Sequence, residues 1–173
     1  MQTSQCNSKD LAYRTRIPIV NEDEPILTAR ALADAVEKFT EEFFGGAVLC
    51  ESVDLDIQLL VNREGLAFLI TAILTNVSGL GVCKISYSLA DDGLNVDFAF
   101  AGSDDYSSAW GTELFACADK YGFSISVIER GVRIFVPLSY GTGSPLHSRG
   151  YDNFFDLLTA AYRIFRKKII ETL

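Results

Sequence analysis

The chain has 173 residues, which is enough for one domain with an added helix or tail. Apolar residues make up 49% of it and charged residues 22%, which excludes wholesale disorder. A net charge of -8 argues against nucleic acid as a partner, because a binding face must neutralise phosphates. No apolar run approaches the ~20 residues that span a bilayer, and the polar N-terminus lacks the apolar core of a signal peptide. We therefore expect a cytoplasmic protein without a transmembrane segment.

The cysteine and histidine content argues against metal and nucleophile chemistry. Cys6, Cys50, Cys83 and Cys117 are widely spaced and form no CxxC pair, so we expect reduced, packed thiols. The single histidine, His147, cannot complete a zinc-ligand set or a catalytic triad. It lies in a stretch rich in glycine, so we interpret it as a loop residue without a chemical role.

The predicted elements begin after a tail over 1–24. Pro25 opens a predicted helix over 25–44, since proline is tolerated in a first helical turn. Strands are predicted at 48–50 and, from strict alternation, at 53–59. Asn62 caps the strongest predicted helix, over 64–78, whose apolar residues form one broad stripe. The remaining predicted elements are, in chain order, a hairpin over 83–100 with its turn at Asp91–Gly93, a helix over 108–121, a hairpin over 123–136 across Arg130–Gly131, a linker over 139–150 and an amphipathic helix over 151–173.

This order of elements predicts the fold class. Antiparallel hairpins separated by helices favour an α/β two-layer sandwich, a mixed and mostly antiparallel sheet with helices on one face. Extra helices stand at the N- and C-terminal ends. We expect residues 25–138 to form the domain and residues 139–150 to link it to the last helix.

Three short motifs lie at the end or the start of predicted elements. Ile-Leu-Thr-Asn76-Val ends the central helix, Phe-Ala-Phe-Ala-Gly102 ends the first hairpin, and Gly111-Thr-Glu lies near the start of the helix predicted over 108–121. In this order, over 48–138, they resemble the GHKL (Bergerat-fold) ATP-binding domain of sensor histidine kinases. The resemblance implies that Asn76, Gly102 and Gly111 occupy the positions of a nucleotide site, with Asn76 at the position that holds Mg²⁺.

The chain departs from that family where a nucleotide needs specific groups. The resemblance puts Ala72 at the position of a polar or acidic general base, and Phe100 at the position of the aspartate that reads adenine. Asp104 replaces the second glycine of its motif, and Glu113 brings negative charge where phosphates need close backbone approach. The segment between the two glycine motifs is short for an ATP lid. We therefore expect a degenerate domain with no catalytic residue and no cofactor.

Together these patterns predict a function without catalysis. The favoured hypothesis is a nucleotide-binding-deficient histidine-kinase-like domain that acts as a protein-interaction or regulatory module in signalling. The alternative is a divergent ATP-binding protein or kinase of the GHKL class, which would use ATP with Mg²⁺ at Asn76 and Gly102. A third hypothesis is a purely structural subunit.

The last helix carries the candidate interaction residues, which are Phe154, Phe165, Arg163, Arg166, Lys167 and Lys168. The basic cluster fits an anionic membrane or an acidic partner, or it complements the negative end of its helix. Both terminal helices carry aromatic stripes, which must pack on each other, on the sheet rim or on a second chain, because soluble proteins rarely expose such patches. We predict a homodimer with at least one terminal helix buried between chains.

Overall fold

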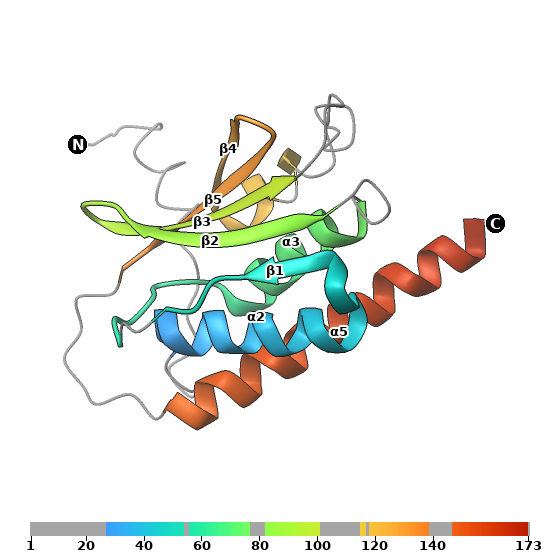
Figure 1. The fold of residues 1–173 in the computed structure, drawn as a ribbon, viewed down its shortest axis with the longest axis horizontal. Coiled ribbons are helices and arrows are strands. Elements are labelled where there is room, and N and C mark those ends of the chain that lie inside the picture. Colours follow the sequence, from blue (N-terminus) through green and yellow to red (C-terminus); the bar gives the residue numbers. More distant parts are fainter. Residues whose placement is uncertain are drawn as a thin grey trace, which may run out of the picture.

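A five-stranded mixed sheet lies on one side of the molecule and its long helices lie on the other (Figure 1). The structure, a computed structural model, describes residues 27–53, 56–76, 82–100, 115–116, 118–138 and 147–172. The helices whose bounds are described are α2 (Ala29–Phe43), η1 (Gly45–Ala47), α3 (Arg63–Asn76) and α5 (His147–Thr172), and residues 115–116 and 118–121 are helical as well. The strands are β1 (Val48–Cys50), β2 (Cys83–Leu89), β3 (Gly93–Phe100), β4 (Ser124–Ile128) and β5 (Gly131–Pro137). Their order in the sheet is β1-β2-β3-β5-β4, and only the β1–β2 pair is parallel. The predicted mixed, mostly antiparallel α/β architecture is confirmed.

Local capping signals fix where two of the helices begin. The Asn62 side chain accepts a hydrogen bond from the Gly65 N–H at 2.8 Å, so the predicted cap of α3 is confirmed. The N-terminal helix begins later than predicted, at Ala29, because the Thr28 hydroxyl accepts from the Ala31 N–H at 3.1 Å and acts as its cap. Pro25 lies outside the described residues.

The strand predicted at 53–59 is wrong for the described part of that segment. There, only Gln58 and Leu59 form isolated bridges, to Thr28 and Leu138 respectively. The segment runs between the start of α2 and the end of β5, so it meets different partners one residue at a time. The alternation of apolar and polar residues in this segment therefore does not correspond to a regular strand.

Both predicted hairpins form, and a glycine begins the second strand of each. Gly93 begins β3, where a side chain would collide with the Phe135 ring. The second turn lies at Glu129–Arg130, one residue earlier than predicted, and Arg130 takes a left-handed backbone with φ 56°. Gly131 instead begins β5, because a Cβ atom there would strike the Phe98 carbonyl oxygen.

The C-terminal helix is longer than predicted and belongs to the core. It begins at His147, which was expected in the linker, and it packs across α2 and α3 on their side away from the sheet (Figure 1). Phe154 and Leu158 are completely buried there. They belong to the same hydrophobic cluster as Phe39 of α2 and Phe98 of β3. The last helix is thus a structural part of the domain.

We predict that Phe154→Ala lowers the free energy of unfolding by about 3–5 kcal/mol, because it leaves a cavity in a closed core. Ile164→Ala, on the same helix at a side chain that is 50% exposed, should cost well under half as much. Urea unfolding followed by circular dichroism measures both. Equal small losses would contradict the packing of α5 against the core.

Candidate functional site

Two positions that the resemblance to the GHKL domain would assign to nucleotide contacts hold apolar core residues. Ala72 on α3 is 7% exposed and Phe100 at the end of β3 is 3% exposed, and both belong to the main hydrophobic cluster. A methyl group cannot activate water, and a phenyl ring cannot accept a hydrogen bond from the adenine amino group in the manner of a carboxylate. These two residues do not fit an adenine nucleotide.

The remaining predicted positions are described only in part. Asn76 is the last residue of α3, its side chain lies outside the described residues, and so do Gly102 and Gly111. Near Asn76 the hydroxyls of Thr71 and Thr75 donate to carbonyl oxygens of their own helix, that of Thr71 to Ala67 at 2.7 Å. Both threonines therefore use their donor hydrogens locally rather than for a ligand.

The aromatic stripes of the terminal helices cover each other within one chain. The Tyr162 ring of α5 lies 4.8 Å from the Phe43 ring of α2, between centroids. Phe165 lies 4.6 Å from Phe68 of α3, and Phe154 is fully buried. This is one of the three arrangements that the sequence left open. The apolar side chains that we expected at an interface between two chains are therefore largely covered within one chain. The homodimer through a terminal helix stays a prediction.

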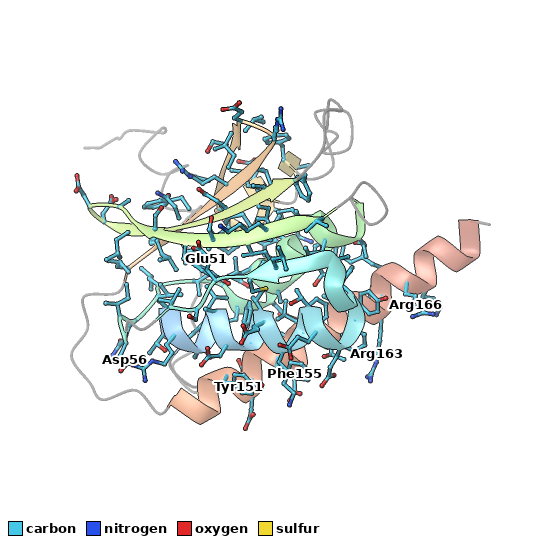
Figure 2. The ribbon with its side chains drawn as sticks, viewed as in Figure 1. Glu51, Asp56, Tyr151, Phe155, Arg163 and Arg166 are labelled. Atoms are coloured by element: carbon cyan, nitrogen blue, oxygen red, sulfur yellow. The ribbon has the colours of Figure 1, made fainter. Side chains whose placement is uncertain are left out.

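The basic cluster is exposed on the outer part of α5. Arg163 and Arg166 extend away from the body of the protein (Figure 2), and Lys167 is exposed as well. The Lys168 side chain lies outside the described residues. The last turn of α5 contains no basic residue, and dipole effects fade beyond the terminal turn. A cluster placed before that turn is therefore not accounted for by the charge of its own helix end.

A small polar cluster that the sequence did not predict lies between α2, β1 and β2. The Thr40 Oγ1 and Cys50 Sγ atoms are 3.3 Å apart, and the Thr40 hydroxyl also lies 2.9 Å from the Glu37 carbonyl oxygen. The buried Tyr87 hydroxyl finds no hydrogen-bond partner among the described residues. Tyr87 fits the alternating apolar pattern of its strand, so no sequence signal marks this hydroxyl.

Burial governs the titration of this cluster. It raises the pKa of Tyr87 well above its ordinary value of 10.0, with smaller contributions from the negative charge of neighbouring groups such as Cys50 and Glu37. Burial also raises the pKa of Cys50, and it raises that of Cys83 from 9.0 to about 12. These thiols are protonated at neutral pH, so the cluster is not a nucleophile site.

The outer face of the sheet carries both polar and apolar side chains where the structure describes it, with Lys84 beside Leu49 and Asn95 beside Phe135. Its central feature is the cross-strand pair of Asp97 on β3 and Arg133 on β5, joined by two hydrogen bonds of 2.7 and 2.9 Å. The hydrogen bond to Asp97 and the charge of that carboxylate raise the pKa of Arg133. A bidentate pair of this kind stabilises the register of two neighbouring strands.

The chain matches no protein-family model and no curated protein. Within the described residues, no three potential metal-ligating side chains gather into one site. The helices in that part of the chain include none that is both long enough and apolar enough to cross a membrane.

We predict that Tyr87→Phe is neutral or stabilising, by up to about 1 kcal/mol, because it removes a buried hydroxyl that lacks a partner. Thr40→Val is the matched control in the same cluster, and it should destabilise the protein because its hydroxyl is bonded. Urea unfolding measures both variants. A clear loss of stability in Tyr87→Phe would mean that the hydroxyl has a partner.

We also predict that stability falls as the pH rises from about 9 toward 12. The unfolded chain releases the Cys83 proton near pH 9.0, whereas the folded protein holds it until about pH 12, so alkali favours unfolding across that window. Thermal unfolding at successive pH values should show the decline. It should be shallower in Cys83→Val, and an identical slope in that variant would contradict the assignment.

Proposed function

We propose that this protein is a non-catalytic histidine-kinase-like domain that has lost nucleotide binding and acts as a protein-interaction or regulatory module in signalling. The observation that carries the proposal is the burial of Ala72 and Phe100, the two nucleotide-site positions that are described, in the hydrophobic core. The succession of α2, β1, α3 and two hairpins supports the likeness to the GHKL domain. A cytoplasmic location belongs to the same proposal.

The energetics favour a domain without nucleotide affinity. Removing a phenyl ring such as that of Phe100 from a closed core costs about 3–5 kcal/mol. A nucleotide that displaced this ring would have to offset a cost of that order before any net affinity remained. Opening the core to admit adenine therefore works against nucleotide binding. The alternative, a divergent ATP-binding protein, finds no support in the described residues.

The exposed part of α5 supports the interaction role. Arg163 and Arg166 carry no ion pair among the described residues, and Lys167 stands beside them. Their positive charge is a local exception in a chain of net charge -8. An acidic protein surface is the partner that such a cluster attracts and orients. Self-association through a terminal helix remains part of the proposal as a second form of interaction.

We predict that millimolar Mg-ATP or Mg-ADP leaves the melting temperature unchanged to within about 1 °C, because a ligand raises stability only if it binds the folded state. Differential scanning fluorimetry measures this directly. Asn76→Ala and its neighbour Thr75→Ala serve as a matched pair of variants. A rise of several degrees that disappears in Asn76→Ala but persists in Thr75→Ala would establish the ATP-binding alternative instead.

A further inference from the structure

The two edges of the sheet differ in how they are protected. β1 has three residues and lies against α2, where Thr40 contacts Cys50. β4 has five residues, reads Ser-Ile-Ser-Val-Ile and pairs only with β5. Natural edge strands are usually blunted by charged residues, by proline or by being short. β4 has no charged residue and no proline, and within the described residues no element other than β5 pairs with it.

The backbone pattern shows which groups of β4 face the open edge. The Arg130 carbonyl oxygen accepts from the Phe100 N–H at 2.8 Å. The backbone N–H and C=O groups of the even-numbered residues of β5 therefore point toward β3. The odd-numbered residues then face β4, where they pair with Ser124, Ser126 and Ile128. The N–H and C=O groups of Ile125 and Val127 therefore point to the free edge, where no described backbone group bonds them.

The side chains of β4 alternate between the two faces of the sheet, with Ile125 and Val127 on one face and Ser124, Ser126 and Ile128 on the other. Val127 is 60% exposed, the highest value among the described large hydrophobic residues, and Ile125 beside it is partly buried. Both lie on the helix-facing side of the sheet, because they pair with the buried Val132 and Ile134. Ser126 lies on the opposite side.

We propose that β4 pairs in antiparallel fashion with β4 of a second copy of this chain, about a two-fold axis at Ser126. In this register Ile125 lies opposite Val127 of the other copy, and each such pair exchanges both of its N–H···O bonds. The exposed Val127 side chain is then covered by a branched apolar neighbour. The two sheets become one continuous sheet across the dimer, and the edge disappears.

The sequence of β4 favours a second copy over an unrelated strand. A two-fold axis at Ser126 places Ile125 opposite Val127 twice, once on each side of the axis, so that a branched apolar residue covers each exposed Val127. Beyond the strand, Glu129 of one copy falls opposite Phe123 of the other, so like charges do not meet. One strand pair is small beside the roughly 1,200 Å² of a standard interface. The dimer should therefore be weak, with a micromolar Kd. This inference goes beyond the proposed function, because it holds whether or not nucleotide binds.

Sedimentation velocity across the micromolar range tests the proposal with the full chain. The average mass should rise from 19.0 kDa toward twice that value as concentration increases. Val127→Lys should weaken association at least tenfold, since it places a charge on the edge. Leu89→Lys, at a similarly exposed side chain at the end of β2 (54%), should dimerise as the wild type does. A monomer at all concentrations, or undiminished association in Val127→Lys, would overturn the proposal.

Disulfide trapping supplies a second measurement that does not weaken the edge. Residues at the two-fold axis form a non-hydrogen-bonded pair with Cα atoms about 4.5 Å apart, within the range that a disulfide spans. Ser126→Cys should form covalent dimers on mild oxidation. Ser88→Cys, on the same face of β2, and the unsubstituted protein should form far fewer. Equal trapping in all three would contradict the β4 interface, as would dimers that Arg166→Glu abolishes, since these would place the contact on α5.

Discussion

The structure depends on one hydrophobic core that joins the inner face of the sheet to three helices. Phe98 of β3, Phe39 of α2 and Phe154 of α5 are all completely buried in it. Each side chain of this size contributes several kcal/mol, whereas a domain is stable by only about 5–15 kcal/mol in total. The long C-terminal helix is therefore needed to close the core. Its exposed basic residues belong to the same helix as the buried Phe154.

The same core is the reason that we propose no ATPase chemistry for this protein, although its order of elements resembles that of the GHKL domain. A nucleotide site needs polar groups and space at the end of β3 and along α3, and the core fills both positions with Phe100 and Ala72. Packing density and a ligand cavity compete for the same volume. Within the described residues, the outer face around Asp97, the basic part of α5 and the β4 edge stay accessible, and we propose them as surfaces for contact with other chains.

The sequence predicted those features that depend on local signals. The Asn62 cap and the two hairpins are confirmed because capping side chains and alternating residues act over a few positions. The strand at 53–59 is wrong because its alternation is met by bridges to distant residues, which no local pattern reveals. The pairing of Tyr162 with Phe43, the buried hydroxyl of Tyr87 and the edge position of β4 likewise depend on tertiary contacts and strand order.

The central claim is that stable core packing has replaced the nucleotide site, and native-state hydrogen exchange tests it most directly. We predict that the amides of Ala72 and Phe100 exchange only through global unfolding, like those of the central strands, and at the same rates with and without millimolar Mg-ATP. Faster local exchange at these two residues that slows when Mg-ATP is added would contradict the account.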